Sequence, residues 1–257
     1  MHILATTLTN YNPISQNSTF EKPFSLLQLL IICDIIILQK GRMMNYLFID
    51  IECCDGKHMC SLGGVLIDQN FHMIDKFDIL INPQQRFKIN NCKKDLKLFY
   101  PQDLFLKQPS FANFYTKIKH LLTLDGLSII GFSILNDFNF INYACNRYGL
   151  KQLELSGFDV QLLYKTINHD NQVHSLERIA NELDIPYGSF ALHKSCDDAH
   201  LSMFILRTLC YNEKLDIGQI LDKYSMCKVD SKLYIPSDDR CKKHKNTFKE
   251  SFPQHSF

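Results

Sequence analysis

This chain of 257 residues has no Cys-x-x-Cys pair, no tryptophan and almost no net charge. The first and the last of these absences limit the functions that it could have. It has no Cys-x-x-Cys pair, so its ten cysteines do not have the usual spacing of a structural zinc site. Reduced thiols and a cytoplasmic location are therefore expected. Its net charge is only +1, so a nucleic acid could be bound only in a local groove and not by an overall basic field. Tryptophan is absent, and 19 phenylalanines and 11 tyrosines supply the aromatic bulk.

The sequence also lacks a run that could span a membrane. The apolar stretch 26–38 is too short for a bilayer and is interrupted by Gln28 and Asp34. No cationic segment precedes it and no small-residue cleavage site follows it, unlike a secretory signal. We therefore expect no membrane partner. Residues 1–43 form either an accessory helix or an upstream extension of no structural consequence.

The most informative stretch is the segment 46–52, with the sequence YLFIDIE. It is apolar on both faces, which is typical of a central strand. Alternation places Asp50 and Glu52 on one face, because residues two apart in a strand point the same way. Two neighbouring carboxylates in a buried strand repel each other and are costly to desolvate. A divalent cation is the simplest partner for them.

The remaining pattern predicts an α/β domain with a mixed sheet. Two strand-like segments joined by a tight turn at 68–70 predict an antiparallel hairpin beside the central strand. Later segments alternate between helix and strand. The expected strands are 59–68, 71–81, 127–131 and 158–160, and the expected helices are 93–99, 110–122, 136–148, 175–184, 197–210 and 216–224.

A third carboxylate, Asp137, lies at the start of the helix expected at 136–148. It lies one turn before Ile141, on the same face as the apolar residues of that helix. Two interpretations stay open for it. Either Asn136 or Asp137 caps the helix, or Asp137 binds a ligand.

The fourth carboxylate is Asp198, at the start of the helix expected at 197–210. It precedes Leu201 and Ile205 at helical spacing, so it too lies at the edge of a buried face. The spacing Ser195-x-x-Asp198 also resembles a capping box, which would make the acid purely structural. His193, in the preceding loop, is by itself more typical of a surface residue than of a catalyst.

Together these residues are more specific than any one of them. Four carboxylates with a single histidine form an oxygen-rich set, which suits Mg²⁺ or Mn²⁺ better than zinc. Two such ions, roughly 3.5–4 Å apart, are a known arrangement for phosphodiester cleavage. The pattern therefore predicts a metal-dependent nuclease.

In its motifs the sequence resembles the DEDDh family of 3′–5′ exonucleases, which includes ribonuclease T. The family's Asp-x-Glu strand motif matches 48–52, FIDIE. Its second motif, a glycine followed by a helix that begins with Asp, matches 131–137, GFSILND. Its third motif, His-x-Ala-x-x-Asp-Ala, matches 193–199, HKSCDDA. The sister class has Tyr four positions before the last Asp, where this chain has Lys194. The resemblance covers 44–210.

Three places depart from the family pattern. Cys53, Cys54 and Asp55 follow the first motif where a Thr-Thr-Gly type is common; Phe132 and Ser133 replace the usual His-Asn; Ser195 replaces Ala. None of these changes removes an acidic residue or the histidine of the motifs.

The resemblance implies a ribonuclease H-like fold, with a five-stranded sheet in the order 3-2-1-4-5 flanked by helices. It implies release of nucleoside monophosphates from single-stranded or 3′-overhanging RNA or DNA, and it allows a homodimer. Two Mg²⁺ or Mn²⁺ ions would be held by Asp50, Glu52, Asp137 and Asp198. His193 would act as general base, and Cys53 and Phe132 would contact substrate.

The sequence leaves two alternatives open, one for the function of the chain and one for the role of its C-terminal residues. The alternative function is a catalytically silent module of the same fold that binds nucleic acid or another protein. Residues 211–257 are expected to form a helix followed by a basic polar tail, which is either merely solvated or assists nucleic-acid binding. Its basic residues are Arg240, Lys242, Lys243, Lys245 and Lys249.

Overall fold

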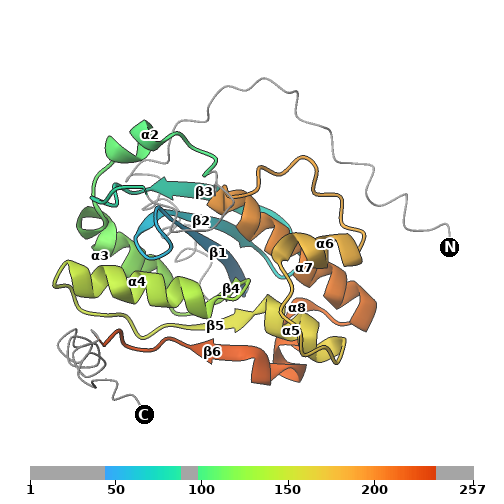
Figure 1. The fold of residues 1–257 in the computed structure, drawn as a ribbon. Helices are drawn as coiled ribbons and strands as arrows, with labels where there is room; N and C mark the ends of the chain where they lie inside the picture. Colours follow the sequence, from blue (N-terminus) through green and yellow to red (C-terminus); the bar gives the residue numbers. More distant parts are fainter. Residues whose placement is uncertain (1–43, 88–97, 236–257) are drawn as a thin grey trace, which may run out of the picture.

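The computed structural model describes residues 44–87 and 98–235, which form a six-stranded mixed sheet with helices on both faces (Figure 1). The strand order is β3-β2-β1-β4-β5-β6. β1 is parallel to β4, and β4 to β5, while the other neighbours are antiparallel. The strands are β1 (Asn45–Cys53), β2 (Met59–Ile67), β3 (Met73–Leu80), β4 (Leu127–Gly131), β5 (Ser156–Asp159) and β6 (Lys228–Asp230). The predicted order 3-2-1-4-5 is confirmed, and β6 extends it.

Helices follow the strands in the order that the sequence pattern predicts, with additions. α3 begins after Ser110, which forms a capping box with Asn113, so the predicted cap is confirmed. The helices are α2 (Gln102–Leu106), α3 (Phe111–Leu122), α4 (Leu135–Arg147), α5 (Val160–Ile167), α6 (Leu176–Glu182), α7 (Ser195–Glu213), α8 (Ile217–Lys223) and the short 3₁₀ helix η1 (Ser225–Cys227).

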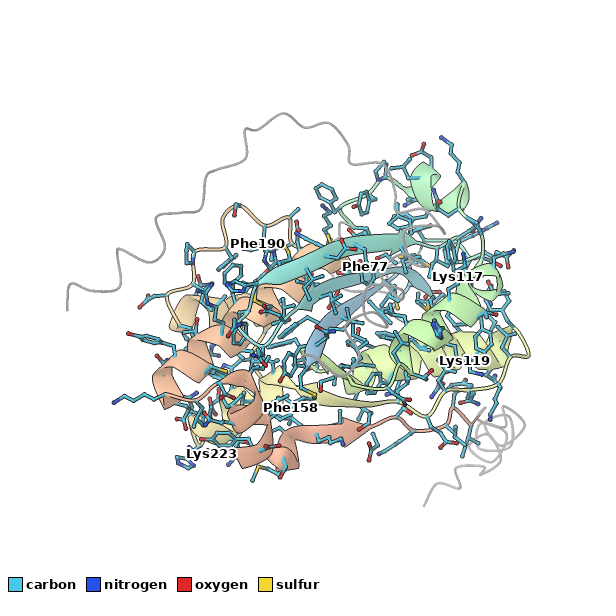
Figure 2. The ribbon with its side chains drawn as sticks, turned by 180° about the vertical axis from the view of Figure 1, so that it is seen from behind. Phe77, Lys117, Lys119, Phe158, Phe190 and Lys223 are labelled. Carbon is cyan, nitrogen blue, oxygen red and sulfur yellow. The ribbon has the colours of Figure 1, made fainter. Side chains whose placement is uncertain are left out.

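The two faces of β1 belong to two different cores. Leu47, Ile49 and Ile51 pack with α3 and α4 on one face. Tyr46 and Phe48 pack with α5, α6, α7 and α8 on the other face. Figure 2 shows the side chains that fill the space on either side of the sheet, with Phe77 labelled on β3 and Phe158 on β5. Alternation along β1 therefore points Asp50 and Glu52 toward the α7 side.

The predicted hairpin of β2 and β3 is present, and a carboxylate shapes its turn. The side chain of Asp68 accepts hydrogen bonds from the backbone N–H groups of Asn70, at 2.8 Å, and His72, at 2.9 Å. This is an Asx-type turn, in which a short acidic side chain replaces a backbone acceptor. The turn joins the end of β2 to the start of β3.

One predicted strand boundary differs from the structure. The strand expected at 158–160 ends at Asp159, whose side chain caps a helix, α5, that the sequence analysis missed. Beyond residue 210, α8 packs into the core on the α7 side, and β6 pairs with β5. α8 and β6 therefore belong to the same core and the same sheet as the elements before residue 210.

Some expectations fall on parts of the chain that the structure does not describe. Residues 1–43, most of the helix expected at 93–99, and the basic residues of 240–249 lie outside the described ranges. Within the described ranges 44–87 and 98–235, no helix is both long enough and apolar enough to cross a bilayer. The cysteines within those ranges are free thiols.

Candidate active site

The carboxylates of β1 lie at its carboxyl end. Asp50 and Glu52 are partly buried, while Ile49 and Ile51 between and beside them are buried in the opposite core. On the adjacent strand Asp50 pairs with Gly63, and Glu52 pairs with Ser61. The strand thus presents two acidic side chains on one face, as the sequence predicts.

Asp137 comes from the first turn of α4 and meets the same strand. Its Oδ1 accepts a hydrogen bond from the backbone N–H of Ile51 at 2.9 Å. The residue at the helix N-cap is Ile134, which makes no capping bond through its side chain. The carboxylate of Asp137 is therefore turned toward β1, and neither Asn136 nor Asp137 occupies the N-cap position.

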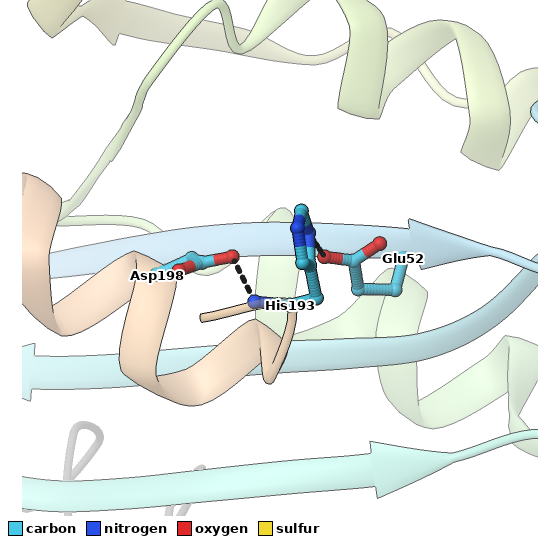
Figure 3. Close-up of side chains that lie close together, drawn as sticks. All are labelled: Glu52, His193 and Asp198. Carbon is cyan, nitrogen blue, oxygen red and sulfur yellow. Dashed lines mark hydrogen bonds and ion pairs between the residues drawn. The ribbon is translucent and has the colours of Figure 1, made fainter. Parts of the chain in front are cut away.

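Asp198 and His193 come from α7 and the turn before it (Figure 3). The backbone N–H of His193 donates to Oδ2 of Asp198 at 3.1 Å. The ring nitrogen Nδ1 of His193 is 3.6 Å from Oε1 of Glu52. His193 has a left-handed backbone, with φ of 63°, a conformation that costs energy in a residue other than glycine. This turn points the imidazole back toward the end of β1.

The capping box expected from Ser195 and Asp198 is absent. The N-cap residue of α7 is Lys194, without a capping bond from its side chain, and Ser195 is already the first helical residue. Asp198 instead holds the turn that carries His193.

Glu52, His193 and Asp198 could together hold a metal ion. One ligand atom from each lies within 4.8 Å of the others. Asp50 and Asp137 are not part of this group of three, although both lie close enough to the other acids for their charges to interact.

The acids raise each other's proton affinity. Burial, then the charges of Asp137, Asp198 and Glu52, hold the pKa of Asp50 well above its usual range. Burial and the charge of Glu52 raise the pKa of Asp198 to about 7. Burial likewise raises the pKa of Asp137 well above its usual value. A concentration of buried negative charge of this kind is unfavourable unless a cation compensates it.

Two buried carboxylate oxygens within this cluster have no hydrogen-bond partner, Oδ2 of Asp50 and Oδ1 of Asp198. Buried polar atoms in proteins are normally bonded, so such atoms need an explanation. Hard divalent cations such as Mg²⁺ and Mn²⁺ take oxygen ligands of this kind. The donor set of this site therefore fits such an ion.

The two proposed substrate contacts are less exposed than the histidine. Cys53 is partly buried against the α3/α4 core, and Phe132 is partly buried against the core on the α7 side. Burial raises the pKa of the Cys53 thiol strongly, so this thiol is not an activated nucleophile.

Sequence reasoning missed an aromatic residue beside the histidine. The backbone N–H of Phe99 donates to the carbonyl oxygen of His193 at 3.3 Å, and 46% of Phe99 is exposed. The Nζ of Lys194 lies 5.3 Å from the centre of the Phe99 ring. An exposed phenylalanine in a polar connection carries no local signal of function, so only the structure reveals this neighbour.

The arrangement of sheet, helices and acidic side chains is the fold of the DEDDh 3′ exonucleases, and the predicted resemblance is confirmed at the level of the fold. No protein-family model matches the chain, and neither does any curated protein sequence.

The solved structures that the chain resembles include several exonucleases. One is the nuclease domain of 3′hExo, a DEDDh family member, bound to rAMP, with 16% identity, a TM-score of 0.54, and coverage of 67% of this chain and 94% of that one. Another is a 3′-exonuclease in a study of its 3′-end specific recognition of a histone mRNA stem-loop, with 14% identity, a TM-score of 0.55, and coverage of 82% and 80%. A third is exonuclease I, with 13% identity, a TM-score of 0.54, and coverage of 70% of this chain and 43% of that one.

Proposed function

We propose that this chain is a metal-dependent 3′–5′ exonuclease that releases nucleoside monophosphates from the 3′ ends of RNA or DNA. The observation that carries the proposal is the meeting of Glu52, His193 and Asp198 beside the partly buried Asp50 and the buried Asp137. These residues come from three distant parts of the chain, and the fold brings them to one end of β1.

Asp50, Glu52, Asp137 and Asp198 are the proposed ligands of two Mg²⁺ or Mn²⁺ ions. The unpartnered oxygens of Asp50 and Asp198 support this assignment, since each is buried and aimed at no protein donor. The chemistry that such ions supply when bound is activation of the attacking water and neutralisation of charge on the leaving oxygen.

His193 is the proposed general base. About 45% of its side chain is exposed, so substrate and water can reach the ring. The contact with Glu52 raises the pKa of His193, because a neighbouring carboxylate favours the imidazolium. A proton taken from the attacking water would therefore be stabilised on the imidazole of this histidine.

Phe99 is a proposed contact for the terminal base, together with Cys53 and Phe132. Bases of single strands stack on exposed aromatic rings whatever their sequence. The adjacent Lys194 ammonium adds a positive charge next to the ring, suited to a phosphate. This combination favours a single-stranded or 3′-overhanging end as substrate.

The direct test uses purified full-length protein with 5′-labelled RNA and DNA oligomers in Mg²⁺ or Mn²⁺. Stepwise ladders shortened from the 3′ end are expected, with nucleoside monophosphates as products. A circular single strand should stay intact. Cutting of the circle would instead indicate an endonuclease.

The same assay separates an enzyme from a silent binding module. The control is Asp103→Asn, since Asp103 lies on α2 with 64% of its side chain exposed and pairs with the exposed Lys107. Binding of the oligomers without shortening, by both the natural chain and this control, would contradict the proposal.

A further inference from the structure

The start of α7 lacks a capping side chain of its own. The first backbone N–H groups of a helix have no partners within it, and a side-chain acceptor usually satisfies one of them. Lys194, the N-cap residue of α7, makes no such bond through its side chain. The helix nevertheless carries Asp198 in its first turn, and His193 lies in the turn just before the helix.

A carboxylate from β3 supplies the missing acceptor. Oδ1 of Asp78, a buried residue, accepts the backbone N–H of Cys196 at 2.9 Å and the hydroxyl of Ser195 at 2.7 Å. The Ser195 hydroxyl is also 2.9 Å from that of Ser61 on β2. A negative charge at a helix N-terminus is favourable because it meets the positive end of the helix dipole. Asp78 therefore caps α7 from another element.

The strand register explains how an acid on β3 reaches this helix. Asp50 pairs with Gly63, and Gly63 pairs with Asp78, so the three residues form a row across β1, β2 and β3. A Cβ at Gly63 would lie 2.1 Å from the backbone nitrogen of Cys196. The first turn of α7 thus rests directly on the β2 backbone, between the two acids.

Asp78 also holds the segment on the other side of the histidine. Its Oδ2 accepts the hydroxyl of Tyr100 at 2.8 Å. The neighbouring residue, Phe99, donates its backbone N–H to the carbonyl of His193. The carbonyl of His193 is therefore fixed by a segment that Asp78 holds, and its N–H by Asp198 in the helix that Asp78 caps.

We propose that Asp78 is a positioning residue for this site, acting through Ser195, Cys196 and Tyr100 to set His193 and Asp198. In the described part of the chain, the hydrogen bonds of the Asp78 side chain go to Ser195, Cys196 and Tyr100, and not to His193 or the proposed metal ligands. The inference rests on the proposed function, and it adds a residue that no motif of the sequence identified. Serine at position 195, where the resembled family has alanine, gives this carboxylate a second donor within α7.

The test compares Asp78→Ala with Asp78→Asn. Asparagine keeps an acceptor for Ser195 and Cys196, and its amide can donate to the Tyr100 oxygen. Alanine removes all three bonds. A displacement near 1 Å costs about 10²-fold in rate, so Asp78→Ala should lower kcat by roughly that factor, while Asp78→Asn stays within about threefold of the natural chain. Equal kcat in Asp78→Ala and the natural chain would overturn the inference.

A general loss of stability has to be separated from misplacement. Ile118→Ala is the matched control, because Ile118 is buried on α3 in the opposite core. It should lower the melting temperature with kcat unchanged when all variants are assayed well below their melting temperatures. A fall in kcat that follows melting temperature across all the variants, Ile118→Ala included, would show Asp78 to be merely structural and would overturn the inference.

A readout independent of catalysis distinguishes this inference from the proposed function. Mn²⁺ affinity, measured by calorimetry on the full chain, should fall about tenfold or more in Asp78→Ala and be restored in Asp78→Asn, because Asp198 moves with α7. If the natural chain binds Mn²⁺ but cuts nothing, this difference still supports positioning while the exonuclease proposal fails. Unchanged Mn²⁺ affinity in Asp78→Ala would overturn the inference.

Discussion

The starts of α4 and α7 each bring a carboxylate to the end of β1, but they are attached differently. Asp137 of α4 accepts a hydrogen bond directly from the β1 backbone at Ile51. Asp198 of α7 instead bonds to the turn of His193, and the helix start is capped from β3 by Asp78. The sheet itself therefore fixes the α4 side. The α7 side depends on contacts that can be changed without breaking a strand pair.

The largest expected effect comes from β1, where both sides meet. Asp50→Ala should lower exonuclease activity about a thousandfold or more, because a metal site supplies several kcal/mol of charge stabilisation. The measurement is the rate of 5′-labelled oligomer shortening, with Asp103→Asn as the control. Full activity in Asp50→Ala after rigorous purification would show that the site is assigned to the wrong residues.

Loss of the His193 side chain, which precedes α7, should lower the rate of the reaction more than it weakens metal binding. His193→Ala is expected to lower kcat roughly 10²–10⁴-fold through loss of general-base help, while Mn²⁺ binding is largely kept by the acids. His72→Ala is a suitable control, since 78% of the His72 side chain is exposed at the β2–β3 turn. Equal kcat values for His193→Ala and His72→Ala would show that His193 is not the general base.

Loss of the aromatic ring beside His193 should weaken substrate binding. Phe99→Ala is expected to raise KM about 5- to 150-fold, since stacking of one base is worth about 1–3 kcal/mol. Phe99→Tyr, which keeps an aromatic face, should behave like the natural chain. Steady-state kinetics on a single-stranded oligomer give the answer, and an unchanged KM in Phe99→Ala would exclude stacking there.

The smallest effect concerns the stability of the metal-free protein. The folded pKa of Asp198 is about 7, above the usual value of 3.8, so the folded state binds more protons than the unfolded state between these values. The free energy of unfolding should therefore fall as pH rises from 5 to 7.5. The raised pKa of His193 acts in the same direction, and the lowered pKa of Asp197 matters only at lower pH.

Urea unfolding in the presence of a chelator measures this trend. Asp198→Asn should flatten it and stabilise the metal-free protein at pH 7.5 by about 1–3 kcal/mol, since it removes a buried charge that Glu52 repels. Added Mn²⁺ should stabilise the natural chain and leave this variant nearly unchanged. A metal-free stability that rises between pH 5 and 7.5 would contradict the repulsion described for these acids.

Much of the fold could be predicted because its signals are local. The alternation in 46–52 identifies β1 and the face that carries Asp50 and Glu52. The helical spacing of Phe111, Phe114 and Ile118 likewise identifies α3. Asp137 and Asp198 could be found because each interrupts the edge of an apolar face at a helix start.

The features that sequence reasoning missed depend on contacts between distant residues. Asp78 looks like an ordinary acid in a strand until its register with Gly63 brings it under α7. β6 is only three residues long, and its pairing with β5 spans a large separation in the chain. α5 was obscured because Asp159 serves both as the last residue of β5 and as the helix cap.

The brevity of β6 also has a consequence for solubility. An open sheet edge offers unpaired backbone groups to other chains, and natural proteins shield such edges with short, charged strands. β6 pairs with β5 through Lys228, Val229 and Asp230, and of these only Val229 packs against the core, while the two charged residues are exposed. A chain shortened to residue 210 would leave the edge of β5 bare. Such a fragment would be prone to aggregation before any question of catalysis arose.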